Sequence, residues 1–364
     1  MKINLAIKMN NFIVFFFLTI MLTASGCLDR IDFTVDGTER ETIIIQGKLI
    51  LGTPSKVEAK ISKLFDFTTN VTSIEVRSCV LMDEDGNTKQ LVKTDRENYE
   101  AIILSDDPDI KVELNKLYKM VVETLDGRTI ESSLELLADV PQPSDLGIEY
   151  FVPSDSLTSD TWFRLFLTTP KDLADGNPAR VRWIIEEVTK ITDAPEPLIP
   201  GRPIEPKTCY ITSNHTTTKV LAADVSELEG SELKNFEIIE SRIKPTYSEG
   251  TYLVVYQESL SEEAYEYWNN IASIIAKNGS MFDLPAGKIF TNFKNTEDPV
   301  EDEVYGYFYA TTQKFLRIYM SPDDMGNPRF YCPPPPMVRN PPLECTDCLS
   351  VPNSTTEKPV WWIE

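Results

Sequence analysis

The stretch Ile74-Glu75-Val76-Arg77-Ser78-Cys79-Val80-Leu81-Met82, followed by Asp83-Glu84-Asp85-Gly86-Asn87, decides the fold class of this chain. Apolar and polar residues alternate up to Met82, which is the period of a β-strand with one buried face. The next five residues tolerate the positive φ angles that a hairpin turn needs. Residues 89–93 then return as a second strand, so the stretch predicts a β-hairpin.

Further strand patterns surround this hairpin. They lie at residues 42–51, 57–62, 99–104, 118–124 and 128–132, with a second Asp126-Gly127 turn. About seven short strands with turns every 8–12 residues or so are typical of a β-sandwich. We therefore predict an immunoglobulin-like or transthyretin-like β-sandwich over residues 41–140. The apolar run at 42–51 predicts a strand buried on both faces.

The segment Val140-Pro141-Gln142-Pro143-Ser144 predicts a linker, because each proline biases the residue before it to an extended backbone. A larger β-rich domain is expected over residues 145–364. Its strand patterns lie at 161–168, 179–188, 248–258, 288–293, 304–311 and 313–319. The fold class is therefore mainly β, with two domains.

One α-helix is expected, at about residues 261–277. Ser261 can cap its first turn, and Ala264, Tyr267, Trp268 and Ile271 follow at helical spacing. Asn278-Gly279 is a typical helix end.

The N-terminus has the pattern of a secretory signal. An apolar run from Phe12 to Leu22 follows Lys2 and Lys8, and it is shorter than the ~20 residues of a spanning helix. Ala24-Ser25-Gly26 then precede Cys27. We predict that residues 1–26 are a lipoprotein signal peptide and that Cys27 is acylated, which anchors the protein to the membrane. An ordinary signal peptide is the alternative, and Gly26 directly before the cysteine argues against it.

Residues 27–40 are polar and acidic and predict a flexible tether. Asp29 and Asp32 within it fit either a surface-export signal or a plain linker.

Composition restricts the possible partners. The chain has 57 acidic and 35 basic residues, for a formal net charge of −22. Such a surface repels phosphate backbones, so we expect no nucleic-acid binding. The hydrophobic fraction of 41% is enough for proper cores, and 25 prolines favour many strands joined by loops.

Five cysteines follow the predicted acylation site. Cys79 lies on an alternating strand and is expected to be a buried free thiol. We expect Cys209, Cys332, Cys345 and Cys348 to form two structural disulfides, because exported cysteines are oxidised. Three pairings are possible, and we favour Cys345–Cys348 with Cys209–Cys332. A redox-active CxxC and a four-thiolate zinc site are the less favoured alternatives.

The sequence lacks the nucleophile elbow, the HExxH motif and the phosphate-binding loop. We expect His215 to be a solvent-exposed loop residue, and the turn at 106–109 to be solvated rather than a calcium site. A glycosidase needs two carboxylates without a local motif, so its acids cannot be chosen here. The aromatic residues at 265–268 and 305–309 fit strand and core packing better than sugar stacking. We predict no catalytic residue, cofactor or metal.

Several C-terminal motifs together resemble a known family. They are 263–268, 278–285, 291–293 with 298–301, 304–308, and the ending Cys345-Thr346-Asp347-Cys348 with Lys358-Pro359. These residues resemble the Bacteroidota lipoprotein family called domain of unknown function 4249. The resemblance covers nearly all of the mature chain. It implies a cell-envelope lipoprotein of a kind often paired with TonB-dependent outer-membrane transporters.

The expected function follows from this location and resemblance. We expect a non-enzymatic accessory or binding module, lipid-anchored at the outer membrane and facing the cell surface, with the periplasmic face as the alternative. Its expected partner is a TonB-dependent β-barrel transporter for nutrient uptake. The alternatives are a carboxylate enzyme acting on surface glycans or peptides, and an adhesion or structural protein.

Overall fold

The structure is a computed structural model that describes residues 42–63, 74–154, 160–173, 176, 179–195, 204–215, 220–225, 229–277, 290–297, 304–333 and 341–363. These residues belong to one compact unit, Glu41–Glu364. The predicted signal peptide (1–26), Cys27 and the tether (27–40) lie outside the described residues.

The prediction of a mainly β protein is confirmed. The largest sheet has ten strands in the order β19-β13-β12-β16-β18-β1-β2-β6-β5, with β14 pairing β12 off this path. Its strands are β1 (Ile43–Leu51), β2 (Ser55–Lys63), β5 (Val92–Lys93), β6 (Asn98–Ile103), β12 (Arg180–Thr192), β13 (Thr208–Asn214), β14 (Ala222–Asp224), β16 (Thr251–Ser259), β18 (Val304–Met320) and β19 (Ser354–Thr355).

Two smaller sheets pack against the large one. The six-stranded sheet contains β3 (Val76–Asp83), β4 (Thr88–Gln90), β7 (Leu117–Thr124), β8 (Thr129–Ser132), β9 (Glu135–Leu136) and β17 (Phe293–Asn295). The three-stranded sheet contains β10 (Asp145–Phe151), β11 (Trp162–Pro170) and β15 (Glu232–Arg242). The described helices are η2 (Pro245–Glu249), α2 (Glu262–Lys277), α3 (Leu343–Thr346) and η3 (Cys348–Ser350).

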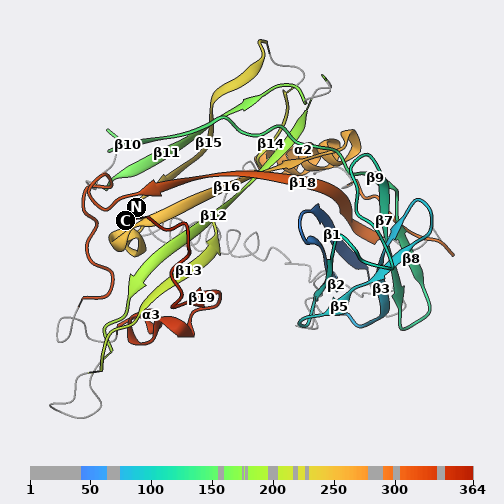
Figure 1. The fold of residues 1–364 in the computed structure, drawn as a ribbon, viewed down its shortest axis with the longest axis horizontal. Coiled ribbons are helices and arrows are strands. Elements are labelled where there is room, and N and C mark those ends of the chain that lie inside the picture. The colour runs from blue at the N-terminus through green and yellow to red at the C-terminus, as the bar shows by residue number, and fades with distance from the viewer. Residues whose placement is uncertain are drawn as a thin grey trace, which may run out of the picture. The chain divides into compact units, whose positions relative to one another are not determined.

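Strand β18 belongs to both halves of the large sheet (Figure 1). Its first nine residues, Val304–Thr312, pair in parallel with β1. Its remaining residues pair antiparallel with β16, from Gln313 opposite Glu258 to Met320 opposite Thr251. The two strands predicted at 304–311 and 313–319 are thus one continuous strand.

The first sandwich packs the β1 end of the large sheet against the six-stranded sheet. Its core holds Ile45, Leu81, Met120 and Phe308, each fully or almost fully buried. Phe308 lies on β18, and β17 pairs with β8 at the edge of the second layer. This sandwich therefore consists of more than residues 41–140, because strands from residues 293–312 complete both of its layers.

The second sandwich packs β12, β16 and the rest of β18 against the three-stranded sheet. Phe163, Leu165, Trp183 and Val255 lie in its core. The segment that joins the two sandwiches is fixed by side chains of the large sheet. Gln257 Nε2 donates to the Pro141 carbonyl at 2.8 Å, and Ser259 Oγ donates to the Ala138 carbonyl at 2.8 Å.

The opening hairpin forms as predicted, with β3 and β4 antiparallel. The strand expected at 89–93 is divided, because β4 pairs with β3 and β5 pairs with β6 of the other layer. Leu91 between them is buried in the first core. The prediction that residues 42–51 are buried on both faces is wrong: Ile43, Ile45 and Leu49 are buried, whereas Gln46 is exposed.

Candidate functional site

A cavity of about 880 Å³ opens on the face of the large sheet that points away from the two cores. Both halves of this sheet contribute to it, together with α2 and the C-terminal segment. Its floor is the polar face of the first sandwich. The floor residues are Gln46 and Lys48 of β1, Lys56, Glu58 and Lys60 of β2, and Asn98 and Glu100 of β6.

The floor follows from strand alternation. On β2, Val57, Ala59 and Ile61 point into the core, so Lys56, Glu58 and Lys60 must lie on the opposite face. Lys56 Nζ lies 3.2 Å from Oε2 of Glu58 and 3.2 Å from Oε2 of Glu100. The lysines and glutamates thus form a row of ion pairs across neighbouring strands.

Glu258 of β16 anchors the most buried part of this network. Its side chain has no exposed surface, and its oxygens lie 3.1 Å from Lys48 Nζ and 3.6 Å from Arg182 Nη1. The Tyr309 hydroxyl donates to it at 2.9 Å, and Gln313 Nε2 donates at 2.7 Å. A buried carboxylate is stable only with such partners.

The pKa values reflect this pairing. Burial opposes ionisation of Glu258, but Lys48 and Arg182 outweigh it and lower the pKa of Glu258. Burial likewise opposes the charge of Lys48, but Tyr309, Glu258 and Glu58 outweigh it and raise the pKa of Lys48. Both groups are therefore charged at neutral pH.

Helix α2 supplies the aromatic wall. Ser261 Oγ accepts from the Ala264 N–H at 3.0 Å, which confirms the predicted cap. One turn later Tyr267 stacks on Tyr307, with ring centroids 4.6 Å apart. Trp268 lies under the Arg182 guanidinium, whose carbon is 3.6 Å from the ring centroid. The helix is thereby fixed to the sheet, and the wall is rigid.

A buried carboxylate of the first sandwich holds the start of α2. Glu135 of β9 accepts hydrogen bonds from the hydroxyls of Ser261 at 2.7 Å and Tyr307 at 2.6 Å, and from Asn292 Nδ2 at 3.1 Å. Burial raises the pKa of Glu135, and the three donors oppose that rise. This contact joins the first sandwich, α2 and β18 at one point.

The aromatic residues predicted at 265–268 and 305–309 divide between two roles. Phe308 points into the first core, as strand alternation requires. Tyr307 and Tyr309 point to the other face, where they line the cavity with Tyr267 and Trp268. Alternation could have separated these faces, but only the tertiary structure shows that α2 covers one of them.

The prediction that His215 is solvent-exposed is wrong. Its side chain is 4% exposed, and Nδ1 contacts the Glu187 carboxylate in the second sandwich. Lys244 Nζ lies 2.7 Å from the same carboxylate. Burial opposes ionisation of Glu187, but His215 and Lys244 outweigh it and lower its pKa to about 2. The residues after β13 turn inward here, because the His215 N–H donates to the Ile185 carbonyl at 2.8 Å.

The four predicted cysteines form two disulfides, but the predicted pairing is wrong. Cys209 pairs with Cys348, and Cys332 pairs with Cys345. The neighbouring cysteines of the CxxC motif are thus joined to different partners. A helical turn (α3) and a 3-10 turn (η3) separate their side chains.

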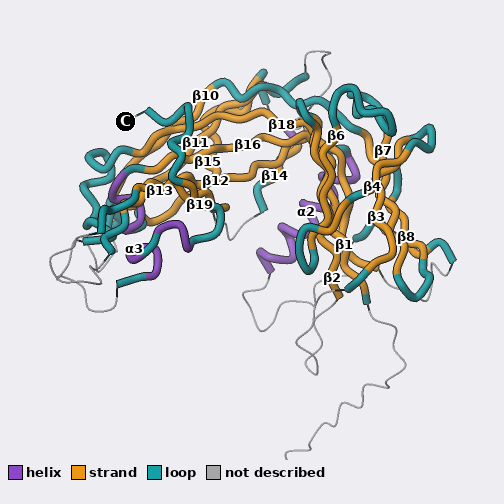
Figure 2. The backbone as a smooth tube through the Cα atoms, turned by 60° about the horizontal axis from the view of Figure 1, so that its bottom comes forward, coloured by secondary structure: helices purple, strands orange, loops and turns teal. Residues whose placement is uncertain are grey.

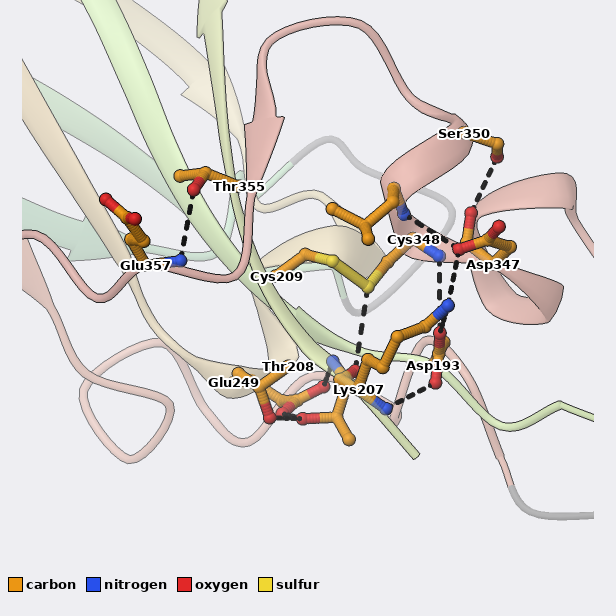
Figure 3. The surroundings of a disulfide bond; sticks show 12 residues. Asp193, Lys207, Thr208, Cys209, Glu249, Asp347, Cys348, Ser350, Thr355 and Glu357 are labelled. Atoms are coloured by element: carbon orange, nitrogen blue, oxygen red, sulfur yellow. Dashed lines mark hydrogen bonds and ion pairs between the residues drawn. A yellow bond between two sulfur atoms is a disulfide. The ribbon is translucent and has the colours of Figure 1, made fainter. Parts of the chain in front are cut away.

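The Cys209–Cys348 disulfide fixes the C-terminal segment to β13 (Figure 3). Asp193 lies beside it and accepts from the N–H groups of Lys207 at 2.6 Å and Cys348 at 3.4 Å. The segment continues as β19 along β13 and contributes Asn353 to the cavity. Figure 2 shows this C-terminal part of the chain beside β13.

Other predicted groups lie away from the cavity. Cys79 is a free, buried thiol, as predicted, and burial raises its pKa to about 12. In the turn at 106–109, Lys89 Nζ lies 2.6 Å from Asp107 and 3.1 Å from Asp109. Within the described ranges no cluster of three metal-ligating side chains occurs. None of the helices in these ranges is long and apolar enough to cross a bilayer.

The fold and the cavity define a tandem β-sandwich protein with a preformed polar binding cavity. The chain belongs to the family described as Domain of unknown function (DUF4249), which it matches over residues 29–317. No curated protein matches it.

Two solved structures share parts of the chain. A DUF4785 family protein from Legionella pneumophila is 15% identical, with a TM-score of 0.20, over 59% of this chain and 52% of that one. The present chain thus spans about half of that relative. Trypsin-activated alpha-2-macroglobulin from Escherichia coli is 8% identical, with a TM-score of 0.19, over 61% of this chain and 14% of that one.

Proposed function

We propose that this protein is a non-enzymatic cell-envelope binding module that acts with a TonB-dependent outer-membrane transporter in nutrient uptake. In this proposal Cys27 carries the lipid anchor in the outer membrane, and the cavity receives the nutrient at the cell surface. The acylation pattern around Cys27 and the family resemblance support the location and the partner.

The single observation that carries the binding role is the preformed cavity. Its volume of about 880 Å³ lies within the range of small-molecule sites. Its lining groups are held by ion pairs, ring stacking and the buried Glu258, so binding costs little reorganisation.

The chemistry of the cavity favours binding over hydrolysis. The two floor glutamates, Glu58 and Glu100, both contact the Lys56 ammonium. A glycosidase needs one acid that holds a proton for the leaving group, and a shared cation keeps both acids ionised.

The test is affinity purification of the full-length acylated protein from the outer membrane of its own host, followed by identification of the captured proteins. We expect a TonB-dependent transporter to be enriched with the wild type and lost with Cys27→Ala, which removes the acylation site. A wild-type sample without any such transporter refutes the partnership.

A further inference from the structure

We infer that the cavity binds a neutral, hydroxyl-rich ligand, namely a short oligosaccharide. The inference rests on the proposed binding function and names its ligand class. Three features of the lining carry it: its charge balance, its unpaired amides and its aromatic wall.

The charges around the cavity cancel. Lys48, Lys56, Lys60 and Arg182 line it, as do Asp95, Glu58 and Glu100. The buried Glu258 contacts Lys48 and Arg182, so four cations face four carboxylates. The whole chain, in contrast, has a formal net charge of −22. A charged ligand would have to break existing ion pairs to be matched, whereas a neutral ligand would not.

The cavity also presents unpaired side-chain amides. Within the described part of the chain, no hydrogen bond joins the amide groups of Gln46, Asn214 or Asn353 to another residue. Each amide both donates and accepts. Sugar hydroxyls do the same, so each amide can bind a hydroxyl in either sense.

The aromatic wall supplies the apolar contact. Trp268 is packed by Arg182 on its ring and by Tyr309 at its edge, with centroids 6.1 Å apart. Its indole N–H has no acceptor among the described residues. Such a donor, buried beside polar groups, is satisfied when a ligand oxygen accepts from it. The C–H face of a pyranose ring fits an aromatic wall, and its hydroxyls fit the polar floor.

The position of the amides indicates an extended ligand. Gln46 lies on β1 of the first sandwich, whereas Asn214 and Asn353 come from β13 and the C-terminal segment of the second. A ligand that contacts all three must cross the large sheet from β1 to β13. A single sugar ring is too short for this, so we infer several linked units.

The test is isothermal titration calorimetry of the full mature chain with neutral gluco-, manno- and xylo-oligosaccharides of several units at millimolar concentration. Uronic-acid oligosaccharides of matched length and a charged peptide serve as comparison probes. We expect at least one neutral oligosaccharide to bind, and to bind more tightly than every charged probe. No binding of a neutral probe, or tighter binding of a charged one, overturns the inference.

Variants place the binding site. Gln46→Ala removes an exposed amide without a described partner, so it should leave the fold intact and weaken binding about tenfold. Trp268→Ala should weaken binding at least as much. Lys119→Met, which breaks an ion pair of the other sheet at 2.6 Å, is the matched control and should leave affinity unchanged. Binding that tolerates both cavity variants overturns the assignment.

The two proposals fail separately. Loss of the transporter from the affinity purification refutes the partnership while oligosaccharide binding still holds. A transporter that is captured by a protein without affinity for neutral oligosaccharides refutes only the ligand class.

Discussion

Replacing Glu258 with glutamine tests whether the buried ion network holds the two sandwiches together. The variant keeps the shape of the side chain and one acceptor oxygen, but it removes the charge between Lys48 of β1 and Arg182 of β12. At an effective dielectric constant of about 20, a pair 3.1 Å apart attracts with about 5 kcal/mol. Desolvation offsets part of this gain, so we expect a net loss of about 3 kcal/mol.

The assay is urea unfolding at neutral pH, followed by circular dichroism and tryptophan fluorescence. The matched control is Glu131→Gln, which breaks the Lys119–Glu131 pair at 2.6 Å. That pair is shorter but 23% and 28% exposed, so its loss should cost less than about 1 kcal/mol. The double variant Lys48→Met/Glu258→Gln should cost less than the sum of its single variants. Equal losses for Glu258→Gln and Glu131→Gln would refute the reasoning, because burial would then not decide the energy.

Three further predictions concern stability. Gly306 has a φ of 104°, and an added Cβ would lie 1.9 Å from the Ile45 carbonyl oxygen, so Gly306→Ala should cost more than about 3 kcal/mol by urea unfolding or prevent folding; Gly147→Ala, where an added Cβ meets nothing within 4 Å, should change stability by less than about 1 kcal/mol. Replacing both Cys209 and Cys348 with serine opens a loop with a sequence separation of 139 and should cost about 5 kcal/mol, more than the ~3 kcal/mol for the bridge with a separation of 13; the reverse order in thermal and urea unfolding would contradict this. The pKa of Glu187 is depressed to about 2, so its contribution of about 3 kcal/mol is present above the ordinary carboxyl pKa near 4.5 and is lost as pH falls towards 2; unfolding at several pH values should show a smaller loss over this window for Glu187→Gln, and equal slopes would count against it.

Local pattern was sufficient for the elements that depend on neighbours in sequence. The alternation at 74–82 and the turn that follows predict β3 and its hairpin, and Ser261 with the spacing to Trp268 predicts α2. These elements are determined by side-chain period and by caps, which are local properties. The same alternation predicts that Cys79 is buried.

The candidate site was much less visible in the sequence. The cavity brings together Gln46, Arg182, Trp268, Tyr309 and Asn353, which are far apart along the chain. Each of these residues has an ordinary explanation in its own element, and no spacing connects them. His215 was misjudged for the same reason, because its polar neighbours in sequence are not its neighbours in space. Its partner Glu187 lies 28 residues away, on β12.

The sequence by itself determined the fold class, the turns, the helix and the identity of the four cysteines that pair. Only the tertiary structure decided that β18 belongs to both sandwiches, that Cys209 pairs with Cys348, and that Glu258 is neutralised by Lys48. The physical reason is that strand order, disulfide partners and buried ion pairs depend on contacts between residues distant in the chain. Residue period specifies which face of a strand is buried, but it does not specify which strand lies beside it.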